Sequence, residues 1–203
     1  MEWIQEEGRR TPVAGVADVI VAGGGPAGVC AAVAAARSGA NTLLLEAGGC
    51  LGGMWTAGCL GWLLDGMDKP KDSLPGELIA GLQARGQMDG KAFDVEAMKL
   101  FLEEWCLASG VRLRYFTTLA DVIKENDRIT HAVTVSKSGR EAWRGKVFID
   151  CTGDGDLGFL AGNPYDTGHP ENGRCQPMSL PALLSGRSEE HTSELQSLAY
   201  LVC

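Results

Sequence analysis

Residues 18–28 read DVIVAGGGPAG and decide the fold, because an apolar, β-branched run stops there at a glycine-rich turn. Asp18 to Ala22 has the pattern of a buried parallel strand. Pro26 suits the first turn of a helix, and the alanine-rich stretch after it continues to Gly39. Residues 41–46, NTLLLE, have the pattern of a second buried strand. The order strand, tight turn, helix and strand predicts one βαβ unit.

The turn of this unit matches the pattern G-x-G-x-x-G. Gly23 permits the tight turn, Gly25 lets the backbone approach a pyrophosphate, and Gly28 lets the helix press on the strand. Free N–H groups at the helix N-terminus, together with the helix dipole, attract phosphates. The predicted phosphate-binding residues are Gly23, Gly24, Gly25, Pro26, Ala27 and Gly28.

An acidic residue, Glu46, ends the second predicted strand about 20 residues after the glycine motif. Its carboxylate is suited to accept hydrogen bonds from ribose hydroxyls, and its charge would repel a 2′-phosphate. NADP is therefore disfavoured at this site. The same unit binds the ADP half of either FAD or NAD, so this part of the chain leaves both open.

Two distal segments favour FAD over NAD. Residues 48–58, GGCLGGMWTAG, place Gly52 and Gly53 just after the acidic residue, where an extended cofactor would leave the βαβ unit. Residues 149–156, IDCTGDGD, end a later predicted strand with Thr152 and Gly153. The two aspartates of this segment keep two interpretations each. Asp154 suits a ligand contact or a turn, and Asp156 suits a ligand contact or the N-cap of a short helix from Leu157.

Residues 11–58 and 146–162 together resemble the FAD-dependent oxidoreductase family that includes heterodisulfide reductase-like flavoproteins. This family lies within the glutathione-reductase-type flavoprotein fold, and the resemblance covers most of residues 11–186. It implies redox transfer through a bound flavin. The residues that it implies for FAD are Gly23, Gly25, Gly28, Glu46, Gly52, Gly53, Thr152 and Gly153, with backbone near Val122 for the adenine.

The other predicted elements complete an α/β fold, a Rossmann-like FAD/NAD(P)-binding domain with a parallel sheet and a small antiparallel β-meander. Helices are expected over 76–85 and 94–109, the second with an N-cap at its first residue. Its apolar positions recur at helical spacing and predict a core face. They are Met98, Phe101, Leu102 and Trp105. A third strand is expected over 111–115, and residues 119–126, 128–136 and 140–150 alternate as a meander with turns at Asn126-Asp127 and Ser138-Gly139.

Composition limits the classes of partner. The chain has 203 residues, 45% of them hydrophobic, and a formal net charge of −8, which argues against a nucleic-acid partner. No apolar run approaches the roughly 20 residues that span a bilayer, and the start of the chain lacks the apolar region of a signal peptide. We therefore expect a cytoplasmic protein without a membrane partner. The small-molecule or protein redox partner stays unidentified.

The seven cysteines include no C-x-x-C pair, which favours buried free thiols. Disulfide reductases of this superfamily carry C-x-x-x-x-C after the glycine pair, but Met54 and Trp55 stand there and only Cys59 lies near the second position. A dithiol mechanism is therefore disfavoured. An iron–sulfur cluster is implied only by the resemblance, because the chain has no closely spaced ligand run. His131 and His169 lack evident partners and are interpreted as structural, so no catalytic residue is named.

Residues 187–197, RSEEHTSELQS, match the translation of a short-read sequencing adapter and show no periodicity that would bury them. We expect residues 1–186 to be the N-terminal FAD-binding portion of a longer protein and residues 187–203 to be a non-native tail. The expected function is that of an FAD-dependent oxidoreductase, inactive as this fragment. An NAD-dependent dehydrogenase and a non-catalytic nucleotide-binding fragment are the two alternatives.

Overall fold

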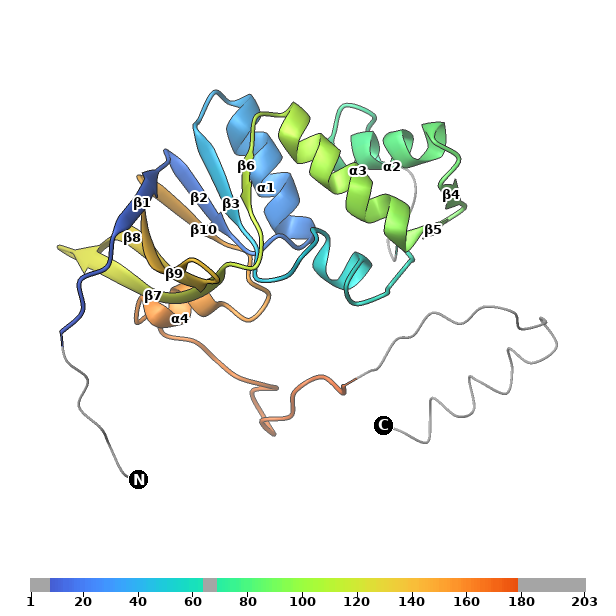
Figure 1. Cartoon of the computed structure of the whole chain (residues 1–203). Helices are drawn as coiled ribbons and strands as arrows, with labels where there is room; N and C mark the ends of the chain where they lie inside the picture. The colour runs from blue at the N-terminus through green and yellow to red at the C-terminus, as the bar shows by residue number, and fades with distance from the viewer. Residues whose placement is uncertain (1–7, 64–68, 179–203) are drawn as a thin grey trace.

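The structure is a computed structural model and describes residues 8–63 and 69–178. Its elements form layers: helices cover one face of a parallel sheet, and an antiparallel sheet lies against the other face (Figure 1). The parallel sheet has the strand order β10-β2-β3-β6. These strands are β2 (Val19–Ala22), β3 (Thr42–Leu45), β6 (Arg112–Arg114) and β10 (Val147–Asp150). The βαβ unit and the third predicted strand are therefore confirmed.

Side chains of the two central strands alternate between the layers. Val21 and Leu44 belong to the core on the helix side. Ile20, Leu43 and Leu45 belong to the core shared with the antiparallel sheet. All five are buried, which explains why these strands read as continuous apolar runs.

The helices on the first face follow the predicted pattern. They are α1 (Pro26–Arg37), α2 (Leu74–Ala84) and α3 (Val95–Ala108). The N-cap prediction for α3 is confirmed, because Ala97 N donates to Asp94 Oδ1 at 3.0 Å. The predicted core positions of α3 are all buried: Met98, Phe101, Leu102 and Trp105. A two-stranded ribbon, β4 (Met88–Asp89) and β5 (Ala92–Phe93), lies between α2 and α3 in the chain.

The second sheet has the strand order β1-β9-β8-β7. We call it the antiparallel sheet after its strands β9, β8 and β7, although β1 at its edge pairs with β9 in parallel. Its strands are β1 (Val13–Val16), β7 (Thr118–Glu125), β8 (Arg128–Ser136) and β9 (Gly139–Arg144). Asn126 and Asp127 both have positive φ, 48° and 66°, as a two-residue hairpin turn requires. The predicted turn at Asn126-Asp127 is thus confirmed. The second turn lies at Lys137-Ser138, one residue earlier than predicted, because Gly139 already pairs with Ser136 as the first residue of β9.

Two details of the predicted sheet are wrong. Residues 140–150 do not form one strand: β9 ends at Arg144 in the antiparallel sheet, and β10 starts at Val147 in the parallel sheet. Gly145 makes the crossing, where an added Cβ would lie 3.0 Å from Ile20 Cδ1. The other miss is β1, a short strand that pairs in parallel with the distant β9 and has little local signal.

Candidate functional site

The carboxyl ends of the four parallel strands meet at one edge, which brings four loops together. Backbone hydrogen bonds of 2.8 Å continue the ladder past the strands and fix the order of these loops. They run from Cys151 N to Ala22 O, from Gly23 N to Leu45 O, and from Glu46 N to Arg114 O. The order along the edge is therefore 151–153, 23–28, 46–49 and 115–118. Ligands of open α/β sheets bind at this end of the strands.

Gly23 and Gly28 are required by close packing of the protein itself. Gly23 has φ +95°, and a Cβ there would lie 2.2 Å from Cys151 O. A Cβ on Gly28 would lie 1.8 Å from Gly23 O. Neither position accepts a side chain, so the tight turn and the close contact of helix with strand are confirmed.

Gly25 differs, because none of the described residues excludes a side chain there. It is the N-cap of α1, with an ordinary φ of −66° and ψ of −176°, and an added Cβ meets no atom within 4 Å. Pro26 occupies the first turn, and Ala27 beside it is exposed. The first N–H groups of a helix have no intrahelical acceptor. The space in front of α1 is therefore open and faces unpaired amides.

Glu46 is held between two loops by backbone N–H groups. Gly24 N donates to Glu46 Oε2 at 2.6 Å, and Gly48 N donates to Glu46 Oε1 at 2.5 Å. The carboxylate is half-buried. An ionised carboxylate offers about four acceptor positions, so these two bonds leave positions for neighbouring hydroxyl groups. The arrangement suits the diol of a ribose.

The second glycine pair packs against the first motif. Gly52 N donates to Gly24 O at 2.8 Å, and a Cβ on Gly53 would lie 3.2 Å from Gly25 Cα. Gly52 and Gly53 have positive φ, 103° and 50°. A short 3-10 helix, η1 (Gly53–Trp55), follows. The structure therefore brings the two predicted glycine segments together.

Thr152 reaches the same edge from β10, supported by Asp150. Asp150 Oδ1 accepts from Thr152 Oγ1 at 2.8 Å and from Thr152 N at 3.1 Å, and Asp150 Oδ2 accepts from Gly158 N at 2.8 Å. Burial acts to raise the pKa of Asp150, but these hydrogen bonds outweigh it and lower that pKa. The carboxylate thus stays ionised and fixes the loop after β10.

The neighbours of Thr152 divide between the loop and helix α4 (Asp156–Leu160). Asp156 N donates to Thr152 Oγ1 at 2.9 Å, but the N-cap of α4 is Gly155, so the predicted cap is wrong by one residue. Gly153 has φ +91° and is exposed. Asp154 is also exposed and lines a separate hollow beside Asp150.

A pocket of about 100 Å³ opens between these loops. It is lined by Ala22, Gly23, Leu45, Glu46, Ala47, Thr117, Thr118, Leu119, Thr152 and Asp156. Val122, predicted near the adenine, is not among these residues. It is buried against α4 with Leu157 and Ala161. Sequence reasoning missed Thr117 and Thr118, although their place directly after the third parallel strand was a usable signal.

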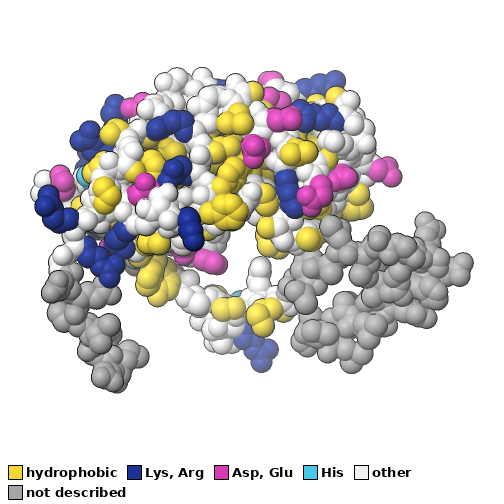
Figure 2. All heavy atoms as spheres, in the orientation of Figure 1, with side chains coloured by type: hydrophobic (Ala, Val, Ile, Leu, Met, Phe, Trp, Pro, Cys, Tyr) yellow, Lys and Arg dark blue, Asp and Glu magenta, His cyan; other side chains and the backbone are white. Residues whose placement is uncertain are grey.

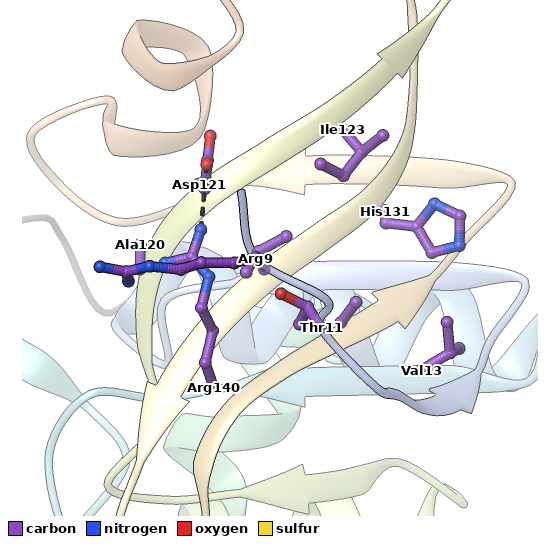
Figure 3. Close-up of a pocket in the computed structure, with 10 residues that line it drawn as sticks. Arg9, Thr11, Val13, Ala120, Asp121, Ile123, His131 and Arg140 are labelled. Atoms are coloured by element: carbon purple, nitrogen blue, oxygen red, sulfur yellow. Dashed lines mark hydrogen bonds and ion pairs between the residues drawn. The ribbon is translucent and has the colours of Figure 1, made fainter. Parts of the chain in front are cut away.

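A larger hollow of about 660 Å³ lies on the antiparallel sheet (Figure 3). Its lining residues are Arg9, Thr11, Val13, Ala120, Asp121, Ile123, His131, Val133, Arg140 and Ala142. It shares no residue with the pocket at the carboxyl edge. Arg140 Nη2 contacts Asp121 Oδ2 at 3.0 Å, and His131 Nδ1 lies 3.0 Å from Thr130 Oγ1. These side chains have partners within the sheet, and none of the ten lining residues belongs to a glycine loop or to a helix N-terminus.

The six cysteines that the structure describes are free. Cys106 is buried, and burial raises the pKa of its thiol to about 12. The predicted burial is wrong for the other five, since Cys30, Cys50, Cys59 and Cys151 are half-buried and Cys175 is exposed. Within residues 8–63 and 69–178, no group of three or more His, Cys, Asp or Glu side chains is placed to hold a metal ion. Over those residues, no helix is both long and apolar enough to cross a membrane.

A family model described as FAD dependent oxidoreductase matches residues 18–199. The match covers both glycine motifs, Glu46 and the Thr152-Gly153 segment. It also runs through residues 187–197, which we interpret as adapter-derived and which lie outside the described residues. No curated protein matches the chain.

Several solved structures have a similar fold. One described as a flavoprotein/dehydrogenase from Cytophaga hutchinsonii has a TM-score of 0.57 at 17% identity, over 76% of this chain and 44% of its own. A geranylgeranyl bacteriochlorophyll reductase-like protein from Thermoplasma acidophilum has a TM-score of 0.54 at 20% identity, over 72% of this chain and 42% of its own. A triple mutant of a flavin-dependent brominase has a TM-score of 0.56 at 18% identity, over 72% of this chain and 41% of its own. This chain thus spans less than half of each, and the likeness confirms the predicted Rossmann-like fold.

Proposed function

Because the chain belongs to the FAD-dependent oxidoreductase family, we propose that the carboxyl edge of its parallel sheet binds FAD and that the protein is a redox enzyme. The observation that carries the proposal is Gly25. Its glycine is not needed for packing, since an added Cβ would meet nothing within 4 Å. A pyrophosphate bound in the open space before α1 would explain the glycine, because a side chain at residue 25 would occupy the same space.

Each loop has a separate part in holding the cofactor. The N-terminal amides of α1 receive the pyrophosphate, which needs neither a cationic side chain nor a metal ion. Glu46, fixed by Gly24 N and Gly48 N, accepts from the ribose hydroxyls with its remaining lone pairs. Gly53, on one side of the glycine loop, and Thr152, on the other, line the path of an extended cofactor. We assign Gly153 and Asp154 to the same path as exposed neighbours of Thr152.

The flavin, when bound, supplies the electron or hydride transfer. The residues of this chain bind and orient it. We assign no described residue at the edge as a catalytic acid or base. His131, the histidine of the meander, lies on the antiparallel sheet and not at the carboxyl edge. The substrate pocket and the electron partner are proposed to come from sequence beyond residue 186. Reading the gene downstream of codon 186 from an independent clone tests this division.

The preference for FAD over NAD is tested by titrating both against the same purified protein. FAD is expected to bind with one site per chain, with quenched flavin fluorescence, and the protein from the full-length gene is expected to be yellow. The support is the second glycine pair, which packs on the first and extends the site beyond the ADP-binding unit. Tighter binding of NAD than of FAD would overturn the proposal.

A closer relation to heterodisulfide reductase-like flavoproteins is proposed from the two segments at residues 11–58 and 146–162. Such relatives are often associated with iron–sulfur clusters. The described residues hold no suitable ligand group, so any cluster would be carried by other sequence or by a partner. Iron and acid-labile sulfide assays on the full-length protein test this relation. Their absence would leave the FAD proposal intact and remove the cluster.

A further inference from the structure

Phe116 is an aromatic residue whose exposure has no explanation in packing. It follows β6 at the carboxyl edge, and its exposed fraction is 69%. The exposed rings of Phe159 and Tyr165 stack edge to face with 5.5 Å between ring centroids, whereas Trp62, 48% exposed, has no aromatic partner among the described residues. Among the described residues, Phe116 has no such aromatic partner. Its ring lies on Gly49, where an added Cβ would be 2.6 Å from Phe116 Cζ.

The backbone of Phe116 is held in an unfavourable conformation. Its φ is +50°, a region that bulky L-residues seldom occupy. Two hydrogen bonds impose it: Phe116 N donates to Gly48 O at 3.0 Å, and Thr117 N donates to Glu46 O at 2.9 Å. Asparagine or glycine would meet this conformation with less strain. Strain of this kind that the surrounding structure maintains is a reason to look for a function of the side chain.

The position of Phe116 along the edge indicates what that function is. The pyrophosphate belongs before α1, after β2, and the ribose belongs at Glu46, after β3. The next strand in the sheet is β6, and strands are about 4.8 Å apart. A base attached to that ribose and continuing in the same direction therefore arrives at the loop after β6. That loop contributes Thr117 and Thr118 to the lining of the pocket. Phe116, directly before them, is not itself a lining residue, and its ring lies on Gly49 in the loop of Glu46.

We propose that Phe116 stacks on the adenine of the bound dinucleotide, with Gly49 kept small so that the ring can lie over the loop of Glu46. The inference rests on the proposed function and adds a specificity-determining contact to it. Stacking of a base on an aromatic ring is tolerant of geometry and contributes affinity without a hydrogen-bond pattern. Phe116 thus binds the adenine half and has no part in holding the flavin ring.

Four substitutions separate the ring from the strain. Phe116→Leu keeps the strain and removes the ring, Phe116→Asn removes both, and Phe116→Trp and Phe116→Tyr keep the ring. The Leu and Asn variants are expected to bind FAD about tenfold more weakly or worse, and the Trp and Tyr variants to bind within about threefold of the wild type. FMN, which lacks adenine, is expected to bind all of them alike. Tyr165→Leu, at a residue 67% exposed, is the control for loss of an exposed aromatic.

The outcomes distinguish this inference from the function on which it rests. A wild-type protein that does not bind FAD overturns the proposed function and the stacking together. A wild-type protein that binds FAD, with Leu and Asn variants of equal affinity, overturns the stacking alone. Circular dichroism and thermal unfolding check that each variant folds, and Phe116→Asn is expected to be at least as stable as the wild type because it relieves the positive φ.

Discussion

The pocket at the carboxyl edge and the hollow on the antiparallel sheet differ in the groups that form them. The pocket at the carboxyl edge is small, about 100 Å³. Backbone hydrogen bonds and glycines that accept no Cβ fix the positions of the loops around it. The hollow on the antiparallel sheet is about 660 Å³ and is lined by charged and aliphatic side chains, with Arg140 paired to Asp121 (Figure 3). Figure 2 shows side chains of both charge signs spread over the visible face, with apolar groups between them.

Because we propose the smaller of these two as the FAD site, the difference teaches that the volume of a hollow is a poor guide to function here. At the carboxyl edge, a glycine that has no room for a side chain lies close to a glycine that has room for one. Gly28 cannot gain a methyl group, whereas Gly25 can. On the antiparallel sheet, charged side chains contact one another, as Arg140 contacts Asp121. Four substitutions, taken from the largest expected effect to the smallest, test this contrast.

Gly28→Ala is expected to cause the largest loss of stability. Its added methyl group would lie 1.8 Å from Gly23 O, a backbone atom that cannot move aside as a flexible side chain could. We expect the free energy of unfolding to fall by about 3 kcal/mol, measured by chemical denaturation. Gly158→Ala is the control, since its Cβ would be 3.6 Å from Asp150 Oδ2, an ordinary contact. A Gly28→Ala protein as stable as this control would contradict the packing of α1 against β2.

Glu46→Gln is expected to weaken FAD binding by about 10- to 100-fold. The amide keeps the shape of the side chain but loses the charge that strengthens hydrogen bonds to the ribose hydroxyls. It also replaces one acceptor of the N–H groups of Gly24 and Gly48 with a donor. Fluorescence titration with FAD measures the effect. Unchanged affinity would place the ribose elsewhere.

Asp150→Asn is expected to destabilise the protein by about 1 to 2 kcal/mol at neutral pH. Hydrogen bonds lower the pKa of Asp150 below its ordinary value of 3.8, so the folded state binds this proton less readily than the unfolded state. The stabilisation is therefore complete above that ordinary value and is lost as the pH falls through the lower folded-state pKa. Denaturation of wild type and variant from pH 7 to pH 3 measures it. A difference in unfolding free energy between wild type and Asp150→Asn that grows as the pH falls would contradict a lowered pKa of Asp150.

Arg140→Ala is expected to have the smallest effect, because it breaks one partly exposed ion pair with Asp121 on the antiparallel sheet. Such pairs contribute about 0 to 1 kcal/mol. FAD affinity is expected to stay within twofold of the wild type. A large loss of affinity would move the functional site from the carboxyl edge toward the larger hollow.

Local sequence was sufficient for the part of the fold made by neighbours in the chain. Residues 18–46 carry strand, turn, helix and strand in one segment, and the structure confirms all four. The core face of α3 and the Asn126-Asp127 turn are likewise local patterns. Each depends on periodicity or on turn chemistry within a few residues.

Features that depend on distant partners were not predictable in this way. The strand β1 exists because β9, more than 100 residues later, pairs with it. The turn from β9 to β10 depends on Gly145 meeting Ile20 of another strand. The local sequence around Phe116 does not predict its positive φ, because hydrogen bonds to carbonyl oxygens of the loop of Glu46 impose it. The site residues could be named from motifs, but the order of their loops required the sheet.

The central claim is that a pyrophosphate occupies the open space before α1, and Gly25→Val tests it most directly. Valine suits the extended backbone of Gly25 before Pro26, and its Cβ meets no protein atom within 4 Å. We predict an unchanged free energy of unfolding without cofactor, within about 1 kcal/mol. We also predict at least about 100-fold weaker FAD binding, equivalent to about 2.8 kcal/mol, in fluorescence titrations. A folded Gly25→Val protein that binds FAD as tightly as the wild type would contradict the account.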